Sequence, residues 1–236
     1  TQKNGRGFIN INTYDPNTGL LLTNRDPLGH GPSYSYNAFG LVLAATNALG
    51  KSTTKTYDVF GNVTTVTYPL GKTTSYTRDL AGNVLSITNA KNQITRYEYD
   101  AFNRLKAVIT PKNERTEYFY LATGELLQIK DPLGNTTNFE YNNLGQLTKK
   151  TDSLGFSVTR TYDENGNVAQ EIDPNGNVKT FAYDDLNQLK KKTLPDNVID
   201  LAYDVRGNVT ETKNQQSVVG FNYDVGGRLT SVQSAG

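Results

Sequence analysis

Apolar and polar residues alternate along this chain in short runs, and the runs recur with a period of about 21 residues. The stretches 62–68 (Asn-Val-Thr-Thr-Val-Thr-Tyr) and 72–77 (Lys-Thr-Thr-Ser-Tyr-Thr) show the alternation and are rich in β-branched and aromatic residues. A period of two in such residues is typical of strands, and proline or glycine interrupts the pattern too often for a long helix. The pattern therefore predicts an all-β chain whose strands are about seven residues long.

A tyrosine marks the same position, here called the register position, in nearly every repeat. Successive register positions are separated by 22 residues, then seven times by 21, then twice by 20, and Arg78 fills one of them. A fixed period of this size indicates an array of units that bury their apolar faces against one another. The structural register tyrosines are Tyr14, Tyr36, Tyr57, Tyr99, Tyr120, Tyr141, Tyr162, Tyr183, Tyr203 and Tyr223.

The residue after each register position opens a predicted turn. It is Asp or Asn in ten of eleven repeats, with Leu121 as the exception, and Gly or Asn follows three places later in all repeats except the first, where the Gly is one place further on. An Asp that opens a type I turn, followed by a residue in the left-handed conformation, is typical of a hairpin loop closed by a bulge. The predicted turn glycines are Gly40, Gly61, Gly82, Gly124, Gly145, Gly166, Gly207 and Gly227.

A second turn lies half a period away from the first. It reads Asp-Pro-x-Gly at 26–29, 131–134 and 173–176, and weaker versions stand at 47–50, 68–71, 152–155 and 194–197. Proline pre-sets the backbone for a type I turn, and we expect the final Gly or Asn to adopt a positive φ. Two turns per period leave two strands, so eleven repeats predict about 22 strands in antiparallel hairpins.

Two further periodic features indicate which side of the sheet is apolar. Leu or Val stands two places after every turn Gly or Asn, and aromatic residues stand two places before most register positions, on the same face as the register tyrosine. Stacked hairpins would align these residues in ladders across the sheet. Because strands twist with a fixed hand, a sheet this long is expected to curve into a spiral or shell. The aromatic residues are Tyr34, Tyr76, Tyr97, Tyr118, Phe139, Phe181 and Phe221.

The amino-acid composition limits the classes of partner that the chain is expected to bind. The chain has 24 basic and 23 acidic residues, a net charge of +1, so it lacks the basic excess that marks nucleic-acid or anionic-membrane binding. The basic run 190–192 falls on a predicted strand and is expected to be solvated. Cysteine is absent, and no apolar stretch approaches membrane-spanning length. We interpret residues 1–236 as a single array cut from a longer one, with any targeting signal outside it.

Few residues are candidates for catalysis, metal binding or ligand binding. His30 is the only histidine, in a degenerate turn without a paired nucleophile, so catalysis is not predicted. Residues 163–167 and 173–177 superficially resemble the start of a calcium loop, but they lack its distant glutamate, and turn formation explains their aspartates. The tyrosines could stack on sugars, although tryptophan, the preferred residue for that purpose, is absent. No catalytic residue, cofactor or metal site is predicted, and glycan binding stays an alternative.

The in-register Tyr-Asp, Gly and Leu or Val positions, together with Asp-Pro-x-Gly at mid-repeat, resemble the YD-repeat (Rhs) family from Tyr14 to about Thr230. The family includes bacterial Rhs polymorphic toxins, the C components of insecticidal toxin complexes, wall-associated proteins and animal teneurins. The resemblance implies that the hairpins coil into a hollow shell, and in the toxins this shell encloses a C-terminal toxic domain.

From this resemblance we expect a non-enzymatic scaffold in a secreted or cell-surface bacterial toxin. Its partner would be the toxin's own C-terminal domain, outside this segment. The alternatives are a cell-surface carbohydrate-binding module that uses the repeated aromatic face and an adhesion protein of teneurin type. A cut array would also expose two sheet edges, which favours strand-edge pairing between copies.

Overall fold

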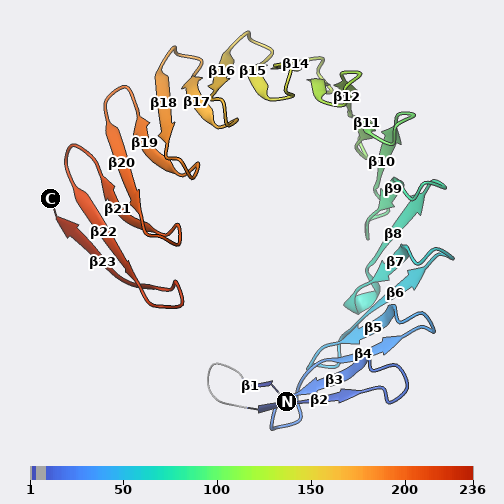
Figure 1. Cartoon of the computed structure of the whole chain (residues 1–236). Helices are drawn as coiled ribbons and strands as arrows, with labels where there is room; N and C mark the ends of the chain where they lie inside the picture. The colour runs from blue at the N-terminus through green and yellow to red at the C-terminus, as the bar shows by residue number, and fades with distance from the viewer. Residues whose placement is uncertain (1, 4–8, 236) are drawn as a thin grey trace. The chain divides into compact units, whose positions relative to one another are not determined.

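A computed structural model describes residues 2–3 and 9–235, and their regular structure is β-strand apart from one short 3-10 turn, η1 (Pro69–Gly71). The described residues form 23 strands, and within each unit neighbouring strands pair antiparallel (Figure 1). This confirms the prediction of an all-β chain of antiparallel hairpins. The chain divides into two compact units, residues 1–117 and 118–236, and the division falls inside β12 (Arg115–Tyr120).

Unit 1 holds the first strands. They are β1 (Gln2–Lys3), β2 (Ile9–Tyr14), β3 (Leu21–Arg25), β4 (Ser33–Tyr36), β5 (Val42–Thr46), β6 (Ser52–Tyr57), β7 (Val63–Thr67), β8 (Thr73–Arg78), β9 (Val84–Thr88), β10 (Ile94–Tyr99) and β11 (Leu105–Ile109), and β11 pairs with the start of β12.

Unit 2 holds the remaining strands. They are β13 (Leu126–Lys130), β14 (Thr136–Tyr141), β15 (Leu147–Thr151), β16 (Ser157–Tyr162), β17 (Val168–Ile172), β18 (Val178–Tyr183), β19 (Leu189–Thr193), β20 (Val198–Tyr203), β21 (Val209–Lys213), β22 (Val218–Tyr223) and β23 (Leu229–Ala235). Most strands in both units have five or six residues, shorter than the predicted length of about seven, because each turn takes up to five residues.

The hairpin β6–β7 shows how the first kind of turn is built. Its pairing runs from Thr54 opposite Thr67 to Thr56 opposite Thr65, and then shifts so that Tyr57 lies opposite Val63. This shift is the bulge that the sequence predicts at the end of the register strand. The Asp58 N–H donates to the Asn62 carbonyl at 2.9 Å, and Gly61 adopts φ +84°, where a side chain would be strained.

The second kind of turn follows the predicted geometry at most positions. At Asp131, for example, the N–H of Gly134 donates to the Asp131 carbonyl at 3.0 Å, and Gly134 has φ +87°. At 194–197 the prediction is wrong, because Asn197 is not among the described residues with positive φ. There the Leu194 N–H donates to the Asn197 carbonyl, which closes the turn one residue earlier, and Asn214 and Ser217 do the same. These two shorter turns explain the two 20-residue steps.

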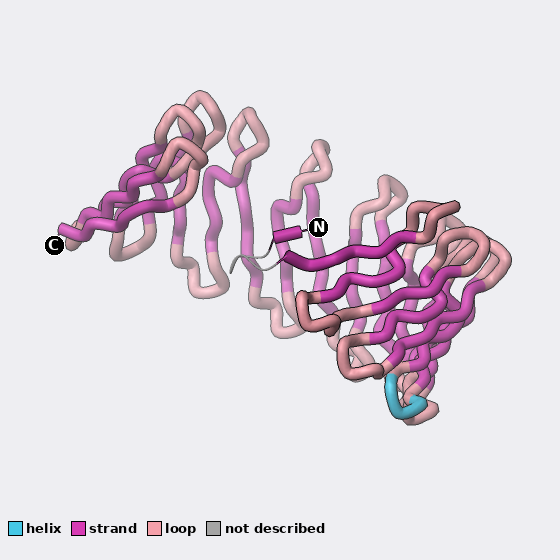
Figure 2. Tube along the Cα trace, turned by 90° about the horizontal axis from the view of Figure 1, so that it is seen from below, coloured by secondary structure: helices cyan, strands magenta, loops and turns pink. Residues whose placement is uncertain are grey.

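The turns form two edges of each unit, and the strands run between them (Figure 2). We call the edge made by the turns after the register positions the register edge, and the edge made by the Asp-Pro-x-Gly-type turns the proline edge. Among the described residues only two hydrophobic side chains are buried, Val66 at 8% exposure and Ala107 at 0%. The aromatic ladder is therefore a half-covered row on a single sheet layer.

Candidate functional surface

Each register tyrosine ends a strand beside the bulge, and in most repeats its hydroxyl reaches back to the preceding repeat. Tyr57 donates from Oη to the Val42 carbonyl at 2.6 Å. The β5–β6 ladder ends at the pair Ala44 and Thr54, so the Val42 carbonyl lies beyond the backbone pairing. The same bond joins Tyr36 to Leu21, Tyr99 to Val84, Tyr141 to Leu126, Tyr162 to Leu147, Tyr183 to Val168, Tyr203 to Leu189 and Tyr223 to Val209, at 2.7–3.1 Å.

Arg78, which replaces the tyrosine in one repeat, makes the same link. Its Nη1 donates to the Val63 carbonyl at 2.6 Å, fifteen residues earlier in the chain. Tyr and Arg share little except a donor at the end of a long side chain, so this position requires a hydrogen-bond donor as well as apolar surface. Of the remaining register residues, Tyr14 is 54% exposed and accepts a bond from Asn12, and Tyr120 ends β12.

Burial favours the protonated form of three of these hydroxyl groups. It raises the pKa of Tyr99, Tyr141 and Tyr183 above the ordinary value of 10, and the Glu125 carboxylate adds to the increase for Tyr141. A raised tyrosine pKa means that the fold favours the neutral, donating form. In these three repeats the donating hydroxyl is therefore kept at neutral pH and is lost as the pH rises through the raised, folded-state pKa.

The carboxylates of the turn aspartates accept hydrogen bonds from backbone N–H groups of the same turn. In the turn after Tyr57, Oδ1 of Asp58 accepts from the N–H groups of Phe60 and Asn62, both at 2.9 Å, and these bonds lower the pKa of Asp58. Asp163, in the stretch that resembles a calcium loop, accepts through both oxygens, from the backbone of Asn165 and Asn167 and from the Asn167 side chain. The geometry is that of a turn, and no group of acidic and histidine residues within the described chain could hold a metal ion.

His30 belongs to the same kind of turn. Its side chain is 65% exposed, and its Nδ1 lies 3.7 Å from Oδ2 of Asp26. The backbone N–H of His30 donates to Oδ1 of Asp26, which lowers the pKa of that carboxyl group. The residue therefore lies in an exposed turn, beside a carboxylate that already serves the backbone.

A second row of links joins successive turns along the register edge. In several repeats the residue after the turn Gly or Asn extends over the next turn. Asn83 donates from Nδ2 to Oδ1 of Asn103 at 2.9 Å, and Asn167 donates likewise to Asn187 at 3.0 Å. In unit 1 a leucine at this position packs over the next turn without a hydrogen bond. The Cδ1 atom of Leu41 lies 3.3 Å from the position that a Cβ atom on Gly61 would occupy. This row was not predicted from the sequence because the position varies between apolar and polar residues.

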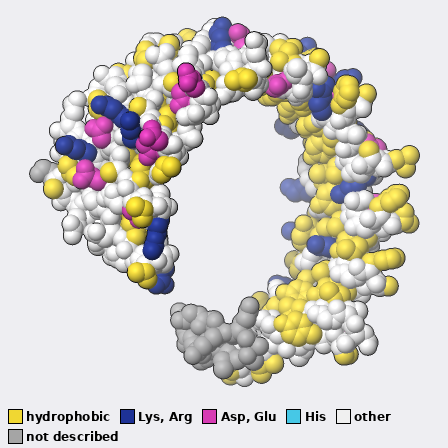
Figure 3. All heavy atoms as spheres, viewed as in Figure 1, with side chains coloured by type: hydrophobic (Ala, Val, Ile, Leu, Met, Phe, Trp, Pro, Cys, Tyr) yellow, Lys and Arg dark blue, Asp and Glu magenta, His cyan; other side chains and the backbone are white. Residues whose placement is uncertain are grey.

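The face that carries the register tyrosines differs between the units. In unit 1 the aromatic residues lie opposite aliphatic ones, as in Tyr76 opposite Ile87 and Tyr97 opposite Val108. In unit 2 some of the corresponding pairs include a charged residue, as in Phe139 opposite Lys150. Figure 3 shows hydrophobic side chains gathered over the strands of unit 1 and more charged side chains over those of unit 2.

Two details show how unit 2 accommodates charge on this face. Glu171 pairs with Arg160 across the hairpin and accepts from Lys179, each at 2.9 Å, and these partners lower its pKa. The Lys192 ammonium lies 5.8 Å from the centre of the Phe181 ring, so this lysine is half-buried, whereas its neighbours 190 and 191 are exposed as predicted. The charged groups at these two places are thus paired or stacked on a ring.

On the opposite face, unit 1 is held by short polar contacts. Thr56 and Thr64 share a hydroxyl hydrogen bond at 2.8 Å. Arg115 donates to both oxygens of Glu98 at 2.8 Å and also contacts Glu117, and Ala107 lies opposite both glutamates in the ladder. The ion pairs raise the pKa of Arg115 and cover Ala107 completely.

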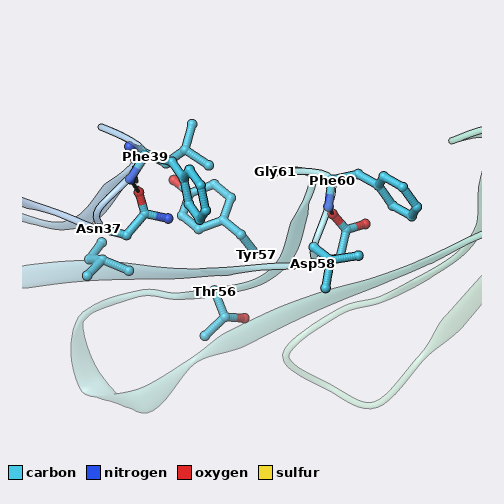
Figure 4. A pocket seen from close by; sticks show the side chains of 10 residues that line it. Asn37, Phe39, Thr56, Tyr57, Asp58, Phe60 and Gly61 are labelled. Atoms are coloured by element: carbon cyan, nitrogen blue, oxygen red, sulfur yellow. Dashed lines mark hydrogen bonds between the residues drawn. The ribbon is translucent and has the colours of Figure 1, made fainter.

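An open cleft lies on the register edge of unit 1, between two successive turns. Its volume is about 610 Å³, and Phe39 and Phe60, 89% and 76% exposed, stand at its rim (Figure 4). The Tyr57 ring and the Asn37 amide line its wall. The cleft is lined mostly by aromatic and aliphatic side chains, with Asn37, Thr56 and Asp58 as polar neighbours, so it could accept a flat apolar surface.

Comparison with known proteins gives one family and several structures. The family model described as Teneurin YD-shell matches residues 33–194. The chain is similar to structures of TcdB2-TccC3-Cdc42 (15% identity, TM-score 0.61), of TcdB2-TccC3 without its hypervariable C-terminal region (16%, 0.62) and of the Photorhabdus luminescens Tc holotoxin pore (15%, 0.56). These matches cover 97–98% of this chain but only 16–17% of those chains. No curated protein matches the chain in sequence.

The described residues contain no helix that is long and apolar enough to cross a membrane.

Proposed function

The chain belongs to the Teneurin YD-shell family, and from this we propose that it is a non-enzymatic segment of shell wall that encloses the toxic domain of a bacterial Rhs-type toxin. The observation that carries the proposal is the row of register side chains, most of which are bonded to a carbonyl of the preceding repeat. Such a row suits a wall, because within each unit neighbouring repeats are joined both by backbone pairing and by a side chain.

The mechanism we propose is containment. The partner is a domain of the same protein, downstream of this segment, and the protein is exported or surface-exposed. The similarity to TcdB2-TccC3 supports this proposal, since that complex has a hypervariable C-terminal region, which one of its structures lacks. A hydrogen-bonded sheet has few openings for a protease, so the wall would keep the enclosed chain from digestion and from early release.

The experiment compares the C-terminal domain of the whole gene product, expressed with the array and expressed alone, in a limited trypsin digest. We expect the domain to survive with the array and to be digested without it. In the whole protein, Tyr141→Ala should speed digestion of both wall and cargo, whereas Leu133→Ala, at a turn tip 87% exposed, is the matched control. A cargo domain digested equally fast in both settings, or the lack of any such domain, would contradict the proposal.

A second candidate function, glycan binding, is favoured by the cleft between Phe39 and Phe60. Exposed aromatic rings offer stacking faces to a sugar. On a glycan array the isolated chain should then bind a glycan reproducibly, and Phe39→Ala with Phe60→Ala should abolish the signal. Leu144→Ala, on the register edge of unit 2 and 82% exposed, should leave it unchanged. Absence of binding, or binding that survives the double substitution, removes this candidate.

A further inference from the structure

The proline edge of unit 1 carries a row of lysines. Lys51, Lys72, Lys91 and Lys112 stand in or directly after four successive turns, all four are exposed, and none has an ion-pair partner among residues 2–3 and 9–235. Two strands separate successive turns on one edge, so the charges recur about every 10 Å. The same edge carries exposed leucines at its turn tips, namely Leu28 at 79%, Leu49 at 81% and Leu70 at 89%.

The register edge of unit 2 carries the opposite charge. Two successive turns, 163–167 and 184–188, hold four carboxylates and no basic residue. Glu164 and Asp185 are the exposed members, 21 residues apart, and within the described chain neither takes part in a turn hydrogen bond or an ion pair. Leu144 and Leu186, 82% and 76% exposed, stand at turn tips of this edge.

We propose that these two edges dock against each other between two copies of the chain, the proline edge of unit 1 on one copy seating on the register edge of unit 2 on the other. The occupant is assigned to a second copy because the two edges carry opposite charges at a similar interval, with lysines in or after successive turns of one edge and Glu164 and Asp185 in successive turns of the other. Opposite charge gives the contact its direction, and the exposed leucines supply apolar area to bury.

The contact joins different surfaces on the two copies, so it is heterologous. It also differs from strand-edge pairing, which uses backbone groups and has no charge requirement. The proposal does not depend on the enclosure of a toxic domain, and its test uses the isolated chain.

The test is sedimentation velocity of the chain over a range of concentrations at low and high salt. We expect reversible association at low salt. At high salt, where the Debye length becomes shorter than the distance between the paired charges, the association constant should fall about tenfold or more. The triple variant Lys51→Glu/Lys72→Glu/Lys91→Glu and the double variant Glu164→Lys/Asp185→Lys should each be monomeric alone. An equimolar mixture of the two variants should associate again, since the reversed edges are complementary.

The matched control is Lys106→Glu/Lys190→Glu/Lys213→Glu, which changes the net charge of the chain as much as the first triple variant but at exposed strand positions. It should associate like the unsubstituted chain, and circular dichroism should show all variants folded. A chain that is monomeric at every concentration would overturn the proposal. So would association that ignores charge reversal or that the mixture fails to restore, and either of these results would instead indicate strand-edge pairing.

Discussion

The two units share one backbone plan but have different surfaces. Residues 1–117 carry 13 basic and 8 acidic residues, a formal charge of +5, whereas residues 118–236 carry 11 and 15, a charge of −4. Where unit 1 sets Tyr76 against Ile87, unit 2 sets Arg160 against Glu171. Yet the bond from the register side chain to the preceding repeat is the same in both, as Tyr57 and Tyr141 show. The fold therefore depends on a few positions in each repeat, and the rest are free to vary with surface chemistry.

The largest effect is expected from removing a whole register side chain. Tyr57→Ala in unit 1 and Tyr141→Ala in unit 2 should each lower the free energy of unfolding by about 2 kcal/mol, because a half-buried ring and a hydrogen bond are lost together. Urea unfolding followed by circular dichroism measures this. Similar losses in the two units support a shared role, and a loss confined to unit 1 would show that apolar packing alone matters.

The next largest effect concerns a left-handed turn residue. Gly82 has φ +89°, and nothing lies within 4 Å of a Cβ placed there, so Gly82→Ala tests backbone strain without a clash. We expect a loss of about 1 kcal/mol in the free energy of unfolding, measured by urea denaturation. Gly82→Asn is the matched control, since Asn103 and Asn187 hold the same conformation in other repeats. Equal stability of the alanine and asparagine variants would contradict the role of strain at this position.

A pair of exchanges tests the difference between the faces directly. Ile87→Lys places a charge in the apolar row of unit 1 and should cost about 1 kcal/mol. Lys150→Ile, opposite Phe139 in unit 2, should be neutral or stabilise by less than about 1 kcal/mol. Thermal unfolding of the two variants provides the comparison. An equal loss of stability in both variants would mean that the polarity of the residues beside the aromatic side chains does not affect stability locally.

The smallest expected difference between the units is in how far each loses stability at acidic pH. Turn aspartates with a lowered pKa number five in each unit among the described residues, for example Asp58 in unit 1 and Asp163 in unit 2. A lowered folded-state pKa contributes stability that is present above the ordinary value of 3.8 and is lost as the pH falls below it. Hydrogen exchange at decreasing pH should show both units loosening together, despite their opposite net charges. Earlier loosening of one unit would indicate that net charge dominates.

The sequence was sufficient to predict the features that repeat. Asp58 and Gly61 mark a turn because few other residues accept their hydrogen bonds or dihedral angles, so the hairpins and bulges followed from spacing. The predicted turn at Leu194 was wrong because Leu-Pro-Asp-Asn is compatible with both a four-residue and a five-residue turn. The spacing of 20 residues between successive register positions, in place of 21, was the signal for the four-residue turn.

The hydroxyl links could not be read from the aromatic pattern alone. Tyrosine on an apolar face is also what packing would select, so the pattern does not separate the ring from its donor. Arg78 was the one informative position, because arginine keeps the donor and loses the ring. The Arg160, Glu171 and Lys179 cluster was missed for a different reason, since it depends on pairing between strands whose register the turns set.

The most direct test of the repeat-to-repeat link is native-state hydrogen exchange on Tyr57→Phe and Tyr141→Phe, which remove only the hydroxyl. We predict that each variant loses about 1 kcal/mol of protection, confined to the substituted hairpin and the one before it, and that the loss is the same in both units. Unchanged protection in both variants, or a loss in only one unit, would contradict a link shared by all repeats.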